Sequence, residues 1–288
     1  MSIQTTVQNR RIRYALTAIK LVLCVLLLVY SSSAQQTDAD DYSSPEVKAL
    51  ITAGVASFKE AHYDEAVANF RKATQLEPGN EKAHLYLGTA YAYQVVPNLE
   101  TPENLHTASS ALAEFDIVLK AHPKDLTAIR QEASIYRNIK QFDQAKALEK
   151  RAVAIDPHNI EALYTIGVLN WMQEYKNAVE ILTTEGLTDN GVGNPNLSRA
   201  GCDALIAKNK ALVDEGIASL TQAIDLKPDY DDAMQYLQLT YRRHADLQCG
   251  DPTGIGADLK LVEGWSKKAM EARKEKEKNL VTPQPRYE

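Results

Sequence analysis

Residues Val47 to Asn80 read VKALITAGVASFKEAHYDEAVANFRKATQLEPGN, and this segment shows the pattern on which the fold prediction rests. It holds two apolar helical segments, and the small residue Gly54 lets a neighbouring helix come close. Tyr63 and Phe70 are large enough to fill the gap between the two helices. Pro78 ends the second helix and begins the next unit. The stretch therefore predicts a helical hairpin that is followed directly by another helix.

Similar proline-containing turns recur along the chain, each after an apolar helical segment. Their prolines are Pro78, Pro123, Pro157 and Pro228. The successive spacings are 45, 34 and 71 residues. A period of 34 is typical of a helix-turn-helix solenoid, and 45 is one period plus an insertion of 11. The sequence thus predicts an all-α solenoid, in which no single core encloses an active site.

The repeat pattern resembles that of the tetratricopeptide repeat family. The residues of the first unit that match the family pattern are Leu50, Ala53, Gly54, Ala66, Phe70, Ala73 and Pro78. Ser57 stands where the family has Tyr. Gly88 and Gly167 occupy the same repeat position as Gly54. The resemblance implies a right-handed α-solenoid, with insertions in two repeats, that binds a protein or peptide.

The turns divide the chain into the following expected segments. Residues 1–34 are a signal peptide, 35–46 a flexible linker, 47–80 the first repeat, 81–125 the second repeat with an insertion, 126–159 the third repeat, 160–230 the fourth repeat with a long insertion, 231–276 a C-terminal helical hairpin, and 277–288 a disordered tail.

The fourth unit leaves two arrangements open. In the first, Ile160–Trp171 pairs with Ala211–Leu226 across an insertion. In the second, Ile160–Trp171 pairs with Tyr175–Gly186, and a further first helix covers Leu197–Ala207. The second arrangement places Asp203 where the family has Leu, so the sequence favours the insertion.

The N-terminal segment has the pattern of an export signal. It carries four basic residues and no acidic residue, and its apolar core is LVLCVLLLVY. Ser32 and Ala34 fit the small-x-small cleavage rule, so Ala34 should be the last residue removed. We therefore expect an exported protein, periplasmic or secreted. The alternative is a retained N-terminal segment that anchors the chain in a membrane.

Cleavage would also change the charge of the chain. The full sequence has 32 basic and 38 acidic residues, so removal of four basic residues leaves 28 against 38, or about −10. Such a charge argues against nucleic acid and against anionic membranes as partners. Contact with a membrane is expected only if the signal segment is retained.

Two cysteines, Cys202 and Cys249, remain in the mature chain. Both lie in irregular or inserted regions, and an exported protein meets an oxidising environment. A disulfide between them is one expectation. The alternative is a pair of unlinked cysteines that act as small apolar side chains.

The sequence offers no pattern of catalytic residues. No two of the six histidines have metal-ligand spacing, and no serine stands in a nucleophile elbow. The two Gly-x-Gly stretches do not follow a strand pattern, which phosphate-binding loops require. We therefore expect no catalytic residue, no metal and no cofactor, and we do not expect an enzyme.

In the family that the chain resembles, the first helix of each repeat lines a concave face. The positions carried over as partner-binding candidates are Lys82, Tyr93, Arg130, Ser134, Arg137, Asn138, Tyr164, Trp171, Arg242 and Arg243. The planar arginine side chain suits carboxylates, and Trp and Tyr supply contact area. We therefore expect an exported scaffold or adaptor for a protein or peptide, with an acidic partner favoured. The alternative is a structural subunit of a cell-envelope assembly that docks through its inserted loops.

Overall fold

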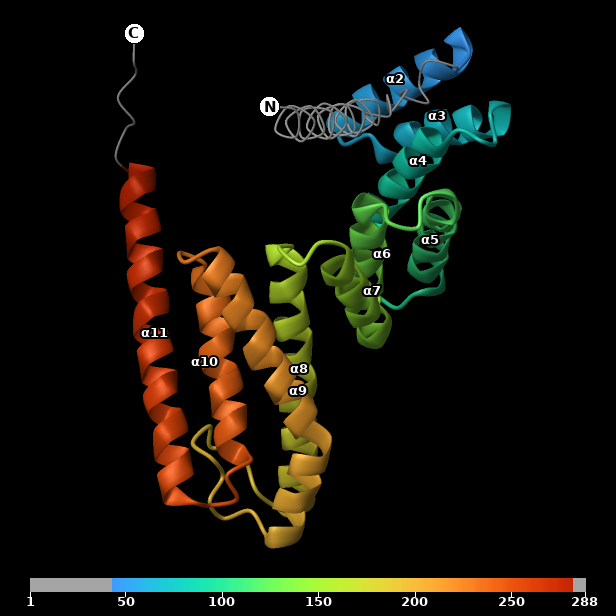
Figure 1. The fold of residues 1–288 in the computed structure, drawn as a ribbon. Helices are drawn as coiled ribbons and strands as arrows, with labels where there is room; N and C mark the ends of the chain where they lie inside the picture. The colour runs from blue at the N-terminus through green and yellow to red at the C-terminus, as the bar shows by residue number, and fades with distance from the viewer. Residues whose placement is uncertain (1–42, 282–288) are drawn as a thin grey trace, which may run out of the picture. The chain divides into compact units, whose positions relative to one another are not determined.

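The computed structural model describes residues 43–281, which form ten α-helices and no strand (Figure 1). The helices are α2 (Pro45–Lys59), α3 (Tyr63–Leu76), α4 (Glu81–Gln94), α5 (Pro102–Ala121), α6 (Leu126–Asn138), α7 (Phe142–Ile155), α8 (Ile160–Thr184), α9 (Arg199–Leu226), α10 (Asp231–Asp246) and α11 (Pro252–Val281). The predicted signal peptide and most of the predicted linker lie outside the described residues.

The chain divides into two units, residues 1–48 and residues 49–288. Of the first unit, the structure describes only residues 43–48, which include the start of α2. The second unit contains the rest of α2 and all the other helices. The predicted disordered tail at residues 277–288 is corrected for residues 277–281, which belong to α11, and residues 282–288 lie outside the described residues.

Three of the four repeated turns begin the next helix by the same hydrogen bond, and the turn before α10 has no side-chain cap. Asn80, Asp125 and Asn159 stand two residues after a turn proline, and each caps the helix that follows. Their side-chain oxygens accept hydrogen bonds from backbone N–H groups three residues later, at 3.0, 2.8 and 3.1 Å. These bonds satisfy N–H groups that a helix leaves without a partner at its N-terminus. The proline ends one helix, and the polar residue after it starts the next.

The two helices of a hairpin approach each other closely at the glycine position of the repeat. A Cβ atom on Gly54 would lie 2.5 Å from the Phe70 ring. A Cβ atom on Gly88 would lie 2.9 Å from the Phe115 ring. Both distances are shorter than van der Waals contact allows, so only glycine lets the aromatic ring pack there.

The fourth hairpin pairs α8 with α9, and Gly167 lies against Leu220 in the same way. The inserted residues lengthen both helices, and the connection between them is a loop at residues 185–198 (Figure 1). The other arrangement does not occur, because α8 is one continuous helix through Tyr175 to Thr184. Burial of Ala178, Ile181 and Leu205 in a cluster of their own explains why the inserted part is helical.

Buried apolar residues form several separate clusters along the second unit. One cluster joins α3 and α4, a second extends from the end of α4 to the start of α8, and a third joins α8, α9, α10 and α11. Each cluster therefore connects neighbouring helices, as expected when repeats contact only their neighbours.

Candidate functional site

The first helices of successive repeats lie beside one another in the second unit. Helix α6 contacts α4, and α10 contacts α8. Side chains of α6 also contact side chains of α8. We call the surface on these helices the first-helix face, and its central residues are Arg130, Arg137, Glu161, Tyr164, Trp171 and Tyr236.

One part of this face is polar and joins α6 to α8. Arg130 lies 3.9 Å from Glu161, and both side chains are more than half exposed. Arg137 donates a hydrogen bond from Nη1 to Oγ1 of Thr165 at 3.4 Å. Both contacts are long, so the two arginines keep hydrogen-bond donors that are free to bind another group. Two of the predicted binding residues are thus brought to one place.

A buried carboxyl group belongs to the same region. Glu149 of α7 is only 4% exposed. Burial raises the pKa of Glu149 to about 7, the positive charges of Arg137 and Arg130 act to lower this pKa, and the negative charge of Glu161 acts to raise it. The sequence pattern places Glu149 where the other repeats have Phe70, Phe115 or Leu220.

The other part of the face is aromatic and joins α8 to α10. The ring of Tyr164 lies 5.0 Å from that of Tyr230 and 5.8 Å from that of Tyr236. Trp171 lies 5.5 Å from Tyr236, edge to face, and stacks on Tyr175 at 5.7 Å. Burial raises the pKa of Tyr164 above its ordinary value, and Tyr236 is the next largest cause. Rings at these distances attract one another and form a continuous aromatic surface.

Of the aromatic residues on this face, the repeat pattern predicts Tyr164 and Trp171 but not Tyr175, Tyr230 or Tyr236. The sequence contains a signal for Tyr236. The repeat pattern places Gln235 on this side of α10, and Tyr236 is the next residue. Tyr175 was missed because it lies in the inserted part of α8, where the repeat pattern gives no guidance.

The remaining candidates on α4 and α6 lie in separate surroundings. Tyr93 is exposed and packs against Phe58 at 4.8 Å and Tyr63 at 5.6 Å. The ammonium group of Lys82 lies 6.0 Å from the centre of the Tyr86 ring. Ser134 and Asn138 are half-buried on α6, and the backbone carbonyl of Asn138 accepts a hydrogen bond from the backbone N–H of Asn98.

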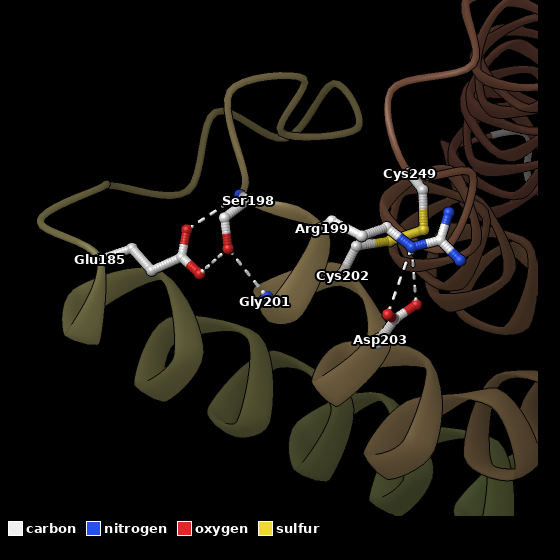
Figure 2. Close-up of a disulfide and its surroundings, with 7 residues drawn as sticks. All are labelled: Glu185, Ser198, Arg199, Gly201, Cys202, Asp203 and Cys249. Atoms are coloured by element: carbon white, nitrogen blue, oxygen red, sulfur yellow. Dashed lines mark hydrogen bonds and ion pairs between the residues drawn. A yellow bond between two sulfur atoms is a disulfide. The ribbon is translucent and has the colours of Figure 1, made fainter.

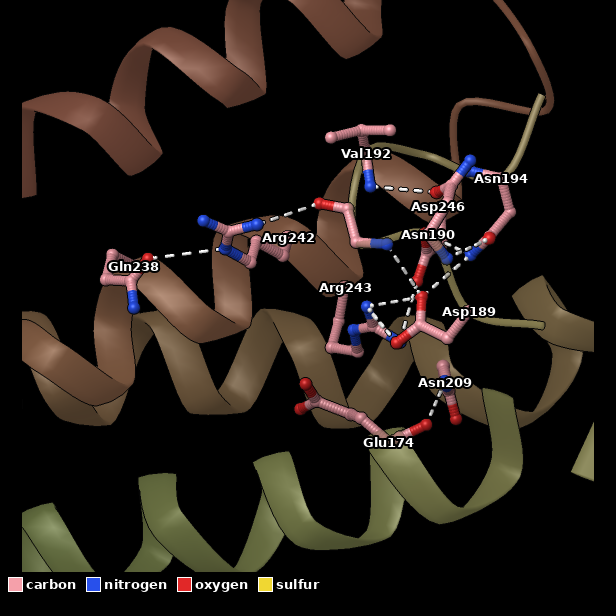
Figure 3. A network of polar contacts seen from close by, with 11 residues as sticks. Glu174, Asp189, Asn190, Val192, Asn194, Asn209, Gln238, Arg242, Arg243 and Asp246 are labelled. Carbon is pink, nitrogen blue, oxygen red and sulfur yellow. Dashed lines mark hydrogen bonds and ion pairs between the residues drawn. The ribbon is translucent and has the colours of Figure 1, made fainter. Parts of the chain in front are cut away.

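Arg243 is corrected from a binding residue to a structural one (Figure 3). Its side chain is 3% exposed and forms ion pairs with Asp189 at 3.0 Å and Asp246 at 3.2 Å. Its neighbour Arg242 donates a hydrogen bond from Nη1 to the carbonyl oxygen of Gly191 at 3.1 Å. Both arginines therefore hold the loop at residues 185–198 against α10, and Arg243 is not accessible to a partner.

The two carboxylates around Arg243 have different protonation behaviour. Burial would raise the pKa of Asp189, but hydrogen bonds and the charge of Arg243 bring it below its ordinary value. Burial raises the pKa of Asp246 to about 7, although Arg243 and Asn194 act to lower it. Asn194 joins the two carboxylates, because its Nδ2 donates to Asp189 at 3.2 Å and to Asp246 at 2.9 Å.

Glu174 of α8 lies close to this network and is completely buried (Figure 3). Neither of its carboxyl oxygens has a hydrogen-bond partner. Burial raises the pKa of Glu174 to about 8, against the lowering effect of Arg243 and Lys146. This shift favours the protonated, uncharged form of the side chain.

A disulfide between Cys202 and Cys249 joins the start of α9 to the loop after α10, with Cα atoms 5.6 Å apart (Figure 2). Ser198 caps α9 by accepting a hydrogen bond from the N–H of Gly201 at 3.0 Å. The Ser198 hydroxyl donates to Glu185 at 2.5 Å and the Ser198 backbone N–H donates to it at 2.9 Å, and these two hydrogen bonds lower the pKa of Glu185. The end of the fourth hairpin is thus fixed by covalent and polar contacts.

The described residues contain no group of three or more His, Cys, Asp or Glu side chains placed to hold a metal ion. Within the same residues, no helix has the length and apolar character needed to cross a membrane.

Comparisons with known proteins bear on the fold and the family. The tetratricopeptide repeat model matches residues 47–80 and 131–159. The structure of a MamA RS-1 ArsTM double mutant superposes with a TM-score of 0.54 at 18% identity, covering 81% of this chain and 97% of that one. A crystal structure of MamA gives a TM-score of 0.53 at 16% identity, covering 83% and 98%. No curated protein shows significant sequence similarity to the chain. Because the repeat model matches two segments and the solved structures share the helical architecture, the chain contains tetratricopeptide repeats and is folded as an α-solenoid.

Proposed function

We propose that the protein is an exported scaffold or adaptor that binds an acidic peptide segment of a partner on the first-helix face. The observation that carries this proposal is the position of Arg130 and Arg137 next to an aromatic surface. The two arginines come from α6, and the aromatic side chains come from α8 and α10. Arg137 lies near Tyr164, because it bonds to Thr165, the residue after Tyr164 on α8.

This combination suits a peptide better than a small molecule. Arginine binds carboxylates through two parallel hydrogen bonds, and exposed aromatic rings bind apolar side chains at low entropic cost. The overall negative charge of the chain makes a local pair of accessible arginines a selective feature, since acidic segments are repelled elsewhere. The repeat architecture supports a scaffold more than an enzyme, because a solenoid presents an extended surface.

A direct test is the selection of random twelve-residue peptides, displayed on phage, on the full chain at pH 6. We expect enriched peptides that contain acidic and aromatic residues. Binding should be lost in the Arg130→Glu/Arg137→Glu double variant and in Trp171→Ala. Arg199→Glu is the matched control, because Arg199 is an exposed arginine at the far end of the fourth hairpin. Failure to enrich any peptide, or equal binding by the double variant, would contradict the proposal.

A second candidate function is docking into a cell-envelope assembly through the inserted loops. The observation that favours it is the exposure of apolar side chains in the insertion of the second repeat, where Val96 is 51% and Leu99 is 41% exposed. Crosslinking in the native cell distinguishes the two functions. Partners that are lost in Val96→Ser/Leu99→Ser, but retained in Arg130→Glu/Arg137→Glu, would establish docking through the loop.

A further inference from the structure

We propose that the insertion of the fourth repeat adds an apolar subsite to the first-helix face, and that the bound peptide fills it with a large apolar side chain about four or five positions from its acidic residue. The subsite consists of Met172, Tyr175 and Val179 on the inserted part of α8. This inference rests on the proposed function above. It adds the spacing of the two residues by which the peptide is recognised.

The inserted part of α8 exposes a stripe of apolar side chains. Met172, Tyr175 and Val179 are 38%, 45% and 37% exposed. They follow one another at intervals of three and four residues, so they lie on the same side of the helix. The stripe lies beyond Trp171, where the repeat pattern predicts the end of the first helix.

This subsite is continuous with the aromatic part of the first-helix face. Trp171 stacks on Tyr175, with ring centres 5.7 Å apart and an angle of 20° between the ring planes. Trp171 also contacts Tyr236 of α10 at 5.5 Å, and Tyr236 lies 5.8 Å from Tyr164 at the arginine end of the face. A peptide that extends from the arginines along α8 therefore crosses these rings before it reaches Tyr175.

The inserted loop holds the Tyr175 ring in place through Arg243. The guanidinium group of Arg243 lies 5.8 Å from the centre of the Tyr175 ring. Arg243 is itself fixed by its ion pairs with Asp189 of the loop and Asp246 of α10 (Figure 3). The cation attracts the ring, and the stack with Trp171 restrains it further. The exposed part of Tyr175 is thus preorganised, so that binding costs little ordering of this side chain.

The distance between the two ends of the site determines the spacing in the peptide. Arg137 is bonded to α8 at Thr165, and Tyr175 lies ten residues further along the same helix. Ten residues of α-helix rise about 15 Å, and an extended peptide covers about 3.3 Å per residue. An acidic residue at the arginines and an apolar residue at Tyr175 are therefore about four or five positions apart in an extended peptide.

An extended peptide fits this site better than a helical one. A helical peptide would need a separation of about ten positions to span the same distance. Short peptides are only marginally stable as helices in water, so this binding mode would include the cost of forming the helix. The two ends differ in chemistry, because the arginines attract a carboxylate and the stripe buries an apolar side chain.

The experiment uses synthetic peptides of equal length that carry a fluorophore, a pair of aspartates and one leucine. The separation between the aspartates and the leucine is varied from two to eleven positions with serine and glycine. Fluorescence anisotropy gives the Kd of each peptide for the full chain. We expect the smallest Kd at a separation of about four or five positions, because two linked contacts reinforce each other most when the linker matches the span.

Variants of the subsite test whether Tyr175 receives the leucine. Tyr175→Ala should raise the Kd of the best-spaced peptide about tenfold, and should leave unchanged the Kd of the same peptide with serine in place of leucine. Tyr175→Phe should bind like the unmodified protein, because it keeps the ring and the stack with Trp171. Ile117→Ala is the matched control, since Ile117 is 39% exposed on α5, a second helix of its repeat, and it should not change the Kd.

The outcomes separate this inference from the proposed function. A Kd that does not depend on the spacing, a smallest Kd at a separation of about ten positions, or equal binding by Tyr175→Ala would overturn the inference. The proposed function stands in each of these cases if Arg130→Glu/Arg137→Glu still abolishes binding. If phage selection yields peptides but none of the spaced peptides binds, the inference alone fails. If neither gives a bound peptide, both fail.

Light scattering tests whether a second copy of the chain covers the stripe instead. The unmodified protein and Tyr175→Ala should have the same mass in solution. A dimer of the unmodified protein that becomes a monomer in Tyr175→Ala would assign the stripe to contacts between copies and would overturn the inference.

Discussion

Gly167 of α8 lies directly against Leu220 of α9, so closely that a Cβ atom at Gly167 would overlap the leucine side chain. The same relationship links Gly54 to Phe70 and Gly88 to Phe115. The recurrence shows that the fourth hairpin keeps the packing of the repeat although its helices are much longer. The contact between Gly167 and Leu220 also joins two residues that have the whole loop at residues 185–198 between them in the sequence.

The first prediction concerns these close contacts. Leucine at Gly167 should overpack the α8–α9 pair and destabilise the fold by about 1–3 kcal/mol. Leucine at Gly88 should do the same to the α4–α5 pair. Because repeats contact mainly their neighbours, hydrogen exchange should show lost protection near the substituted pair in each case. Uniform loss of protection from α3 to α11 in both variants would contradict a modular solenoid.

Gly264→Ala is the control for this prediction. Gly264 is an exposed position of α11, and a Cβ atom there would meet no other atom within 4 Å. Alanine should therefore be neutral or stabilise the protein by up to about 1 kcal/mol, because it reduces the freedom of the unfolded chain.

Much of the fold could be predicted because the repeat has a fixed period and fixed packing positions. Pro78, Pro123 and Pro157 mark the turns, and glycine eight residues into a repeat marks the close helix pair. The end of the chain could not be predicted so well. The sequence EKNLV at residues 277–281 has no repeat position to mark it, and it continues α11.

The site was harder to predict than the fold. Repeat positions identified Arg130, Arg137, Tyr164 and Trp171, which do lie on one face. They also identified Arg243, whose burial depends on Asp189 in the inserted loop. No local pattern reports that a loop folds back onto a helix 54 residues further along the chain. Errors of this kind are expected wherever an insertion covers a repeat surface.

The second prediction concerns the disulfide between Cys202 and Cys249. The two residues are 47 positions apart, and the chain-entropy model gives a stabilisation of roughly 4 kcal/mol for a loop of this size. Cys202→Ser/Cys249→Ser should therefore unfold at a lower denaturant concentration than the oxidised protein. Under reducing conditions the two proteins should be alike. Equal stability under oxidising conditions would show that the bond does not constrain the unfolded chain.

The third prediction concerns the N-terminus of the exported protein. Removal of the signal peptide after Ala34 would give a mature chain that begins at Gln35, and N-terminal sequencing of the exported protein tests this. Thiol titration of the denatured, unreduced protein gives a second readout. Cleavage removes Cys24, so no free thiol should remain when Cys202 and Cys249 are linked. One free thiol per chain, in a membrane fraction, would indicate a retained anchor.

The fourth prediction concerns the pH dependence of stability and the buried Glu174. Its pKa is about 8 in the folded protein and 4.5 in its ordinary state, so the folded protein holds a proton that the unfolded chain releases between these values. Its contribution to the free energy of unfolding is therefore complete below about pH 4.5 and is lost as the pH rises towards 8. Glu149 and Asp246 have raised pKa values and act in the same direction.

Glu174→Gln isolates the contribution of Glu174, because glutamine cannot ionise. Relative to the unmodified protein, this variant should gain stability of the order of 2–4 kcal/mol between pH 5 and pH 8.5, measured by urea unfolding. Glu180→Gln is the control, since Glu180 lies on the same helix, is exposed and pairs with Lys208 at 3.3 Å. A difference between Glu174→Gln and the unmodified protein that stays constant with pH would mean that Glu174 is ionised in the fold. In that case its two carboxyl oxygens would need partners such as bound water, because a buried carboxylate without hydrogen bonds is too costly to persist.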